Sequence, residues 1–177
     1  MIVTFAMLYL FHLDFTPMSV IVSILDYLPE YQSSIRKILE KIGWAEHYII
    51  SMEQSANLFS KDKENFGVYV ALFRGTVVGF LSIQYYAWNQ LCQIQGLAVD
   101  PEFQGQGIAS TLVTRAEDFA RSKKARGIYV DTPILNSGGR KFYEAVGYQV
   151  GYIMPRYYED KLDGVTYQKF FDALKVE

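Results

Sequence analysis

A run of glycine and glutamine between a strand-like and a helix-like segment has the composition of an anion-binding turn. The run reads Gln104-Gly105-Gln106-Gly107-Ile108-Ala109, and Asp100-Pro101 separates it from the apolar stretch before it. Apolar residues then recur at helical spacing from Ile108 to Ala120. A helix N-terminus has unpaired backbone N–H groups and the positive end of the helix dipole, and small residues let phosphates approach them. The spacing therefore predicts a pyrophosphate-binding turn at the start of a helix.

Two common phosphate-binding patterns do not fit this turn. No Lys follows Gly107, as the GxxxxGK[ST] pattern requires, and the spacing is not that of GxGxxG. An ordinary glycine-rich connection between a strand and a helix remains the alternative interpretation.

A second segment, NSGGRKFYEAVGY, has the pattern of a short amphipathic helix. Asn136 is a favourable N-cap residue, Phe142, Tyr143 and Val146 share one face, and Gly147 can end the helix. The residues alone predict a helix packed on a sheet, with Tyr143 in the core.

Together, the two segments resemble the GNAT acyltransferase superfamily. Gln104-x-x-Gly107-x-Ala109 is similar to the Q/R-x-x-G-x-G/A signature that binds the pyrophosphate of acetyl-CoA, and the Asn-started helix with its Phe-Tyr-Glu-x-x-Gly-Tyr run is similar to the second conserved segment. They occur in the family's order, and the resemblance covers about residues 19–171. It implies an α+β protein with a three-layer α/β/α GNAT fold, whose central mixed, mostly antiparallel sheet has about seven strands.

The resemblance also implies an acetyl-CoA-dependent N-acetyltransferase and assigns roles to residues. In the family, an Asn placed like Asn136 contacts the CoA arm, and a Tyr placed like Tyr143 protonates the leaving thiolate. Backbone N–H groups near Leu97–Val99 are expected to bind the thioester carbonyl if the strand bulges there, and Gly96 is compatible with a bulge. The expected cofactor-binding set is Leu97, Ala98, Val99, Gln104, Gly105, Gln106, Gly107, Ile108, Ala109, Ser110, Asn136 and Tyr143.

The sequence leaves the general base unassigned. Several GNAT enzymes have a Glu on the central strand at the position that aligns with Gln93, and a glutamine cannot accept a proton. Either Tyr157, Tyr158 or Glu159 serves through a water molecule, or the acceptor amine arrives already neutral.

The same three residues, Tyr157, Tyr158 and Glu159, are the expected substrate-binding residues. A Tyr-Tyr pair followed by the acidic Asp163-Gly164 turn resembles the ribosomal-protein type of protein N-terminal-amine acetyltransferase, in which the pair lines the peptide groove. The alternative is a β-hairpin whose tyrosines cover the end of the sheet.

Three functions follow from these patterns. The favoured one is an acetyl-CoA-dependent N-acetyltransferase of a protein or peptide N-terminus. The second is the same chemistry on a small amine, such as a polyamine, an amino acid or an antibiotic, which acidic residues near the groove mouth would suit. The third is a CoA-binding module without turnover, which the missing Glu favours and the retained Tyr143 disfavours.

Composition limits the other classes. The chain has 177 residues, which suits one domain, and a net charge of −2, which argues against a general nucleic-acid binder. Its one cysteine, Cys92, and its two histidines lie outside any metal-ligand spacing, so we expect no metal and no disulfide. We expect a cytoplasmic monomer or homodimer that does not act at a membrane.

The expected elements follow from periodicity and turn residues. We predict helices over Pro29–Ile42, Ala45–Phe59 and Ile108–Ala125 and at Asn136, and strands over Ser19–Leu25, Val68–Phe73, Thr76–Tyr86, Leu91–Val99 and Gly127–Asp131 and twice within Tyr148–Phe171.

The N-terminal residues form a separate feature. Met1–Leu13 is strongly apolar but shorter than the roughly 20 residues of a membrane span, and it lacks the basic region of a signal peptide. We expect residues 1–17 to be an extension upstream of a start at Met18, and residues 18–177 to form a single acetyltransferase domain. An extra edge strand or an oligomer contact is the alternative for the extension.

Overall fold

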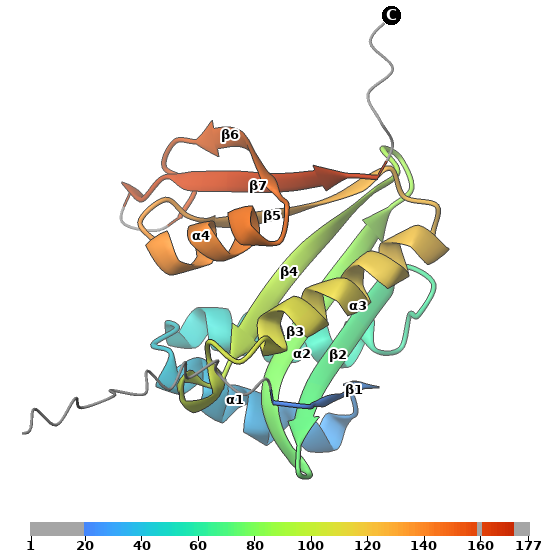
Figure 1. Ribbon diagram of the computed structural model, residues 1–177, viewed down its shortest axis with the longest axis vertical. Coiled ribbons are helices and arrows are strands. Elements are labelled where there is room, and N and C mark those ends of the chain that lie inside the picture. Colours follow the sequence, from blue (N-terminus) through green and yellow to red (C-terminus); the bar gives the residue numbers. More distant parts are fainter. Residues whose placement is uncertain (1–19, 159–160, 172–177) are drawn as a thin grey trace, which may run out of the picture.

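The computed structural model describes residues 20–158 and 161–171. Within that part of the chain, seven strands form one sheet in the order β1-β2-β3-β4-β5-β7-β6 (Figure 1). Neighbouring strands are antiparallel except β4 and β5, which are parallel. The predicted α+β class and the mixed, mostly antiparallel sheet are thus confirmed.

The elements agree with those expected from the sequence, apart from their ends. The strands are β1 (Ser23–Asp26), β2 (Phe66–Phe73), β3 (Thr76–Tyr86), β4 (Leu91–Val99), β5 (Gly127–Pro133), β6 (Gln149–Met154) and β7 (Gly164–Phe170). The helices are α1 (Gln32–Lys41), α2 (Glu46–Phe59), α3 (Ile108–Ser122) and α4 (Ser137–Ala145), and the short turns η1 (Pro29–Tyr31) and η2 (Pro101–Phe103) precede α1 and α3.

The sheet is covered on both faces, which completes the three layers. In Figure 1, α1 and α2 lie behind the sheet, and α3 and α4 lie in front of it. Ile38 and Leu39 of α1 pack with Phe80 of β3 in one core, and Leu112 of α3 packs with Ile83 of β3 in the other. Each helix therefore buries one apolar stripe on the sheet, as its periodicity predicts.

The strands β4 and β5 pair over only part of their length. Leu91–Ile94 pairs with Gly127–Val130, after which β4 continues beside β3, and β5 continues beside β7. The two strands diverge beyond this point (Figure 1). Alternate residues of β4 past Ile94 therefore have backbone groups that face β5 without a strand partner.

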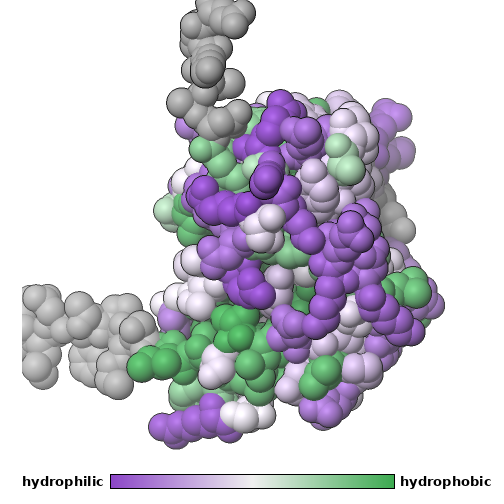
Figure 2. Space-filling view, turned by 90° about the vertical axis from the view of Figure 1, so that its right-hand side faces the viewer, coloured by the Kyte–Doolittle hydropathy of each residue, from purple (hydrophilic) through white to green (hydrophobic). Residues whose placement is uncertain are grey.

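No helix of the described residues is long and apolar enough to cross a membrane. Figure 2 shows a face on which hydrophilic residues predominate, with hydrophobic ones gathered at the level of β1. The N-terminal extension expected at residues 1–17 lies outside the described residues.

Candidate active site

A groove of about 1280 Å³ opens where β4 and β5 diverge. Its lining comes from α2, β4, the start of α3, β5, α4 and the connection after β6. All the predicted cofactor-binding residues line it except Gln106, whose Nε2 donates to the Glu102 carbonyl at 3.3 Å. The two motifs read from the sequence therefore meet in one groove.

The predicted pyrophosphate turn has glycines at the two positions that require them. Gly105 and Gly107 have φ of 73° and 83°, in the left-handed region that residues with a Cβ adopt at a cost. A Cβ added at either glycine would meet nothing within 4 Å, so the space above the backbone is open. Gly107 is the N-cap of α3, and no side chain caps this helix end. Open space over uncapped N–H groups fits a pyrophosphate.

Hydrogen bonds hold the connection between β4 and α3, which contains the predicted pyrophosphate turn. Asp100 accepts hydrogen bonds from the backbone N–H of Glu102 at 3.1 Å and from Nζ of Lys41 at 2.8 Å. The side chain of Gln104 is directed back onto the strand, where its Nε2 donates to the Val99 carbonyl at 3.1 Å. The Gln104 side chain therefore holds the turn through its bond to the Val99 carbonyl. The groups of the turn that remain to donate hydrogen bonds to a phosphate are its backbone N–H groups.

The β4 bulge lies earlier than the sequence suggested. Ser82 pairs with Gly96 and Ile83 pairs with Ile94, so Gln95 is the extra residue, whereas Leu97–Val99 stays in register with β3. A Cβ at Gly96 would lie 2.6 Å from Cε of Met52. Gly96 therefore lets Met52 of α2 pack directly against the backbone beside the bulge.

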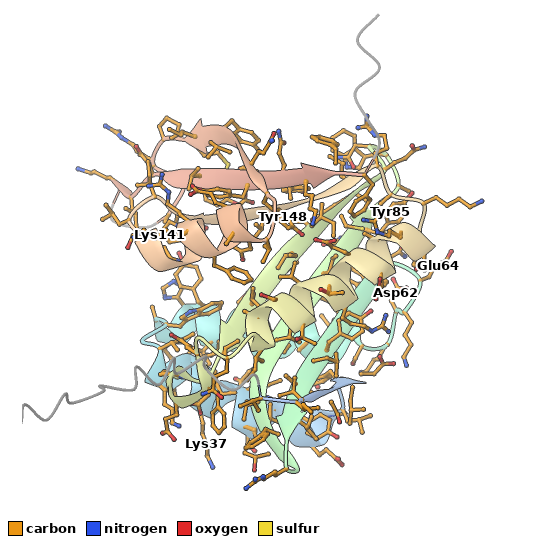
Figure 3. All side chains as sticks on the ribbon, viewed as in Figure 1. Lys37, Asp62, Glu64, Tyr85, Lys141 and Tyr148 are labelled. Atoms are coloured by element: carbon orange, nitrogen blue, oxygen red, sulfur yellow. The ribbon has the colours of Figure 1, made fainter. Side chains whose placement is uncertain are left out.

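Tyr143 is both a core residue and part of the groove. Its side chain is buried, and its ring centroid lies 5.8 Å from that of Tyr148 and 5.9 Å from that of Tyr167. Figure 3 shows Tyr148 between α4 and the end of α3, and Tyr148 is not among the residues that line the groove. Burial raises the pKa of Tyr143. The phenol is therefore protonated at neutral pH and has a proton to donate.

Asn136 begins α4, as its sequence pattern predicts. Its Oδ1 accepts from the backbone N–H of Gly139 at 3.0 Å, and its Nδ2 donates to Oγ1 of Thr132 at 2.9 Å. The side chain therefore joins α4 to the end of β5 at the wall of the groove.

Asp131 of β5 lines the groove and is a candidate site residue that the sequence interpretation missed. Among the described residues that line the groove, it is the only one with a charged side chain. Oδ1 accepts from Oγ1 of Thr166 at 2.7 Å, and Oδ2 accepts from Nε2 of Gln93 at 2.9 Å. Several GNAT enzymes have a carboxylate on β4 where this chain has Gln93. Here a carboxylate lies on the neighbouring strand β5 instead, and Gln93 donates to it.

A sequence signal for this carboxylate existed. Tyr129 and Asp131 are two residues apart on β5, as Gln93 and Gln95 are on β4, so each pair shares one face of its strand. Parallel pairing sets Gln93 beside Tyr129, and Gln93 is hydrogen-bonded to Tyr129, Gln95 and Asp131.

The tyrosine pair lies at the mouth of the groove. Tyr157 and Tyr158 both line it, with their rings edge to face at a centroid distance of 5.0 Å. Burial, followed by the nearby charge of Asp131, raises the pKa of both phenols. A phenol with a raised pKa is a poor base at neutral pH, which disfavours both as the proton acceptor. Glu159, the third predicted substrate residue, lies outside the described residues.

The histidine, cysteine and carboxylate side chains show no metal-like arrangement. Within residues 20–158 and 161–171, no three or more of them lie close enough together to hold a metal ion. Cys92 is fully buried, and this burial raises the pKa of its thiol to about 12, so it is not a reactive nucleophile.

Comparison with known proteins gives the family. Residues 28–148 match the model of the acetyltransferase (GNAT) family. A streptothricin acetyltransferase of Streptomyces lavendulae is 32% identical over 74 residues, which cover 42% of this chain and 39% of the relative. The [ribosomal protein bS18]-alanine N-acetyltransferase assigned in Bacillus subtilis is 32% identical over 68 residues, or 38% of this chain and 45% of that relative. The matches thus span less than half of either relative.

A solved structure of a GNAT-family protein from Desulfovibrio desulfuricans has the same fold. It superposes with a TM-score of 0.76 at 17% identity and covers 85% of this chain and 99% of its own. The chain therefore belongs to the GNAT acetyltransferase family.

Proposed function

We propose that this protein transfers the acetyl group of acetyl-CoA to a primary amine, and that the favoured acceptor is a protein or peptide N-terminus. Acetyl-CoA supplies the acetyl group as a thioester. The observation that carries the proposal is that one groove brings together the uncapped start of α3, the Tyr143 phenol and the Asp131 carboxylate. These supply an anion-binding turn, a proton donor and a proton acceptor.

Asp131 is the proposed general base. As the bond between nitrogen and the acetyl carbon forms, the nitrogen loses a proton, and its acidity rises until a carboxylate is a sufficient acceptor. Asp131 is the only charged side chain among the described lining residues, so it also attracts the amine in its cationic form. The bound ammonium first releases one proton to solvent, because only a neutral nitrogen has the lone pair that attacks, and Asp131 then accepts the second proton. This role replaces the earlier candidates Tyr157 and Tyr158.

Tyr143 is the proposed general acid. When the bond between the acetyl carbon and sulfur breaks, the sulfur needs a proton, and the phenol of Tyr143 donates it. The pKa of Tyr143, raised by burial, keeps the proton on the phenol until a strong base forms beside it. The tyrosine then regains a proton from solvent, and Asp131 loses one, which balances the reaction.

The groove walls favour an acceptor with one cationic centre and hydrogen-bonding neighbours. Tyr48, Ser51 and Ser55 of α2 line the groove together with Tyr157 and Tyr158, so several hydroxyl groups face the acceptor space. A polyamine has several charges and would call for several carboxylates, whereas the described lining has one. A peptide has one terminal amine and a backbone that hydroxyl groups can bond.

A small amine is the second candidate. Its support is the streptothricin acetyltransferase, which shares 32% identity over 74 residues with this chain. Such an acceptor would depend on charge, so salt should weaken its binding.

An acceptor panel tests the proposal. Pentapeptides that begin with Ala, Ser or Gly are compared with spermidine, lysine and streptothricin, and thiol release is measured with acetyl-CoA. We expect turnover of at least one peptide, with an acceptor KM that rises when Tyr157 and Tyr158 are both replaced by Phe. Turnover of a small amine without any peptide would contradict the peptide assignment. Binding of acetyl-CoA without acetylation of any acceptor in the panel would contradict the assignment as a catalyst.

A further inference from the structure

A cluster of amide and phenol side chains surrounds Gln93, whose amide contacts the Asp131 carboxylate. Gln93 Oε1 accepts hydrogen bonds from the hydroxyl of Tyr86 at 3.0 Å, the hydroxyl of Tyr129 at 3.2 Å and Nε2 of Gln95 at 2.9 Å. Its Nε2 donates to Oδ2 of Asp131 at 2.9 Å. The side chain of Gln93 is therefore held on its oxygen side and directed at Asp131 on its nitrogen side.

Chemistry allows only this orientation of the Gln93 amide. An ionised carboxylate accepts hydrogen bonds and cannot donate them, so the group facing Asp131 must be the N–H₂ end. The opposite orientation would set the amide oxygen against the carboxylate, with both groups acting as acceptors. The hydroxyls of Tyr86 and Tyr129 then fix the remaining torsion, because both would lose this acceptor if the Gln93 side chain turned, whereas Nε2 of Gln95 also donates to Gln84 and Tyr86.

Gln93 and Thr166 act on different oxygens of the same carboxylate. Thr166 Oγ1 donates to Oδ1 from β7 at 2.7 Å, and Gln93 donates to Oδ2 from β4. One donor on each oxygen fixes the plane of the carboxylate and leaves a lone pair on each oxygen for an incoming amine. The donors come from both strands that flank β5 in the sheet order.

We propose that Gln93 is a positioning residue that acts through Asp131: its amide holds the carboxylate in the orientation that accepts the proton from the acceptor amine. This inference rests on the proposed role of Asp131. Gln93 is thus a glutamine because its task is to donate to the base on the next strand. A glutamate at this position would face the carboxylate of Asp131 with a second negative charge.

Two variants separate this role from simple packing. Gln93→Met keeps the length of the side chain but removes its N–H donor. Gln93→Glu keeps oxygen acceptors for Tyr86, Tyr129 and Gln95 but replaces the donor with a second carboxylate. We expect each variant to lower kcat for the best peptide of the acceptor panel by roughly 10- to 100-fold, the scale of a lost hydrogen bond to a charged group. The KM for acetyl-CoA should stay within about twofold, because the pyrophosphate turn is unchanged.

A matched control comes from the same cluster. Gln84 accepts a hydrogen bond from Nε2 of Gln95 at 3.2 Å, but it neither contacts Asp131 nor lines the groove. Gln84→Met should therefore leave kcat unchanged. Equal losses from Gln84→Met and Gln93→Met would show that the cluster acts only as packing, and the positioning role would be wrong.

A double-mutant cycle tests whether Gln93 acts through Asp131. In an Asp131→Asn background, adding Gln93→Met should change the residual kcat by less than about twofold. The same fold loss in both backgrounds would overturn the inference, as would wild-type kcat in Gln93→Met. If Gln93→Met does not fold, Gln93→Glu is the deciding variant. Glutamate has nearly the size of glutamine, so a residue that served only for packing would leave kcat at the wild-type value.

The outcome for Asp131→Asn alone distinguishes the two proposals. Loss of kcat in Asp131→Asn with full activity in both Gln93 variants would refute the positioning role and leave the base in place. Full activity in Asp131→Asn would refute the base itself, and the role of Gln93 with it.

Discussion

Gly164 lies against the ring of Tyr157, and a Cβ added at Gly164 would lie 3.0 Å from Cδ1 of that ring. Gly164 begins β7, and Tyr157 lies on the connection from β6, so the glycine sets how closely the mouth of the groove packs on the sheet.

Gly164→Ala should therefore move Tyr157 and weaken acceptor binding. We expect the KM for a peptide acceptor to rise about three- to tenfold, while the KM for acetyl-CoA changes little, because neither Gly164 nor Tyr157 belongs to the pyrophosphate turn. Steady-state kinetics measure both constants. In a Tyr157→Ala background the added alanine should have no further effect. A further loss there would mean that Gly164 acts through the sheet and not through Tyr157.

Gly107→Glu should abolish acetyl-CoA binding. The new side chain would occupy the open space above the helix start and place a negative charge where the pyrophosphate is expected. Calorimetric titration with acetyl-CoA measures the affinity.

Gly75→Glu is a matched control for Gly107→Glu. Gly75 has a φ of 81° with nothing within 4 Å of an added Cβ, so the backbone strain is the same, but the residue lies in the turn between β2 and β3, outside the groove. Unchanged affinity in a folded Gly107→Glu variant would remove the pyrophosphate assignment.

Tyr143→Phe should lower kcat about 10²-fold, the usual contribution of a general acid, with little change in the KM for acetyl-CoA. Tyr148→Phe is the control, because Tyr148 contacts the Tyr143 ring but its hydroxyl is sealed from solvent and outside the groove lining. We expect wild-type kcat from Tyr148→Phe. If both variants lost kcat equally, the loss would come from the packing of the two rings and not from the proton of Tyr143.

Stability should fall steeply above about pH 10. Burial raises the pKa of Tyr143 and Tyr148 in the folded protein above the ordinary value of 10.0. Such a phenol holds its proton more tightly when folded, so the two groups do not change the free energy of unfolding below pH 10. As the pH rises above that value, the unfolded chain loses these protons first, and the folded state becomes less stable.

Urea denaturation between pH 8 and pH 11 measures this effect. The denaturation midpoint should be nearly flat up to about pH 10 and fall beyond it, and phenolate absorbance from the buried rings should appear together with unfolding. Phenolate absorbance that develops fully while the protein stays folded would contradict the raised pKa values.

Local patterns predicted the helices, the strands and the glycine turn before α3 because the residues involved are neighbours in the chain, while the arrangement of these elements was predicted from the family resemblance. Gly107 and the start of α3 are adjacent, and Asn136 caps a helix that begins at the next residue. Short-range spacing is enough to identify such features.

Asp131 was not identified because its partners are distant in the sequence. Gln93 reaches it only through the parallel pairing of β4 with β5, and Thr166 through the antiparallel pairing with β7. Likewise, Gly96 was recognised as compatible with a bulge, but its contact with Met52 of α2, which leaves no room for a Cβ, joins residues far apart in the sequence. Which helix covers which strand is a tertiary choice that periodicity alone does not specify.

The short ladder between β4 and β5 has a thermodynamic consequence. It ends after Ile94 and Val130, so the strands from β1 to β4 form one half of the sheet, and β5, β7 and β6 form the other. A ligand that binds both the start of α3 and the α4 wall cross-links these halves. At a concentration of 100 times its Kd, such a ligand adds about 2.7 kcal/mol to the free energy of unfolding. Protection from amide hydrogen exchange should then rise most in Leu91–Ile94 and Gly127–Val130, where the two halves meet.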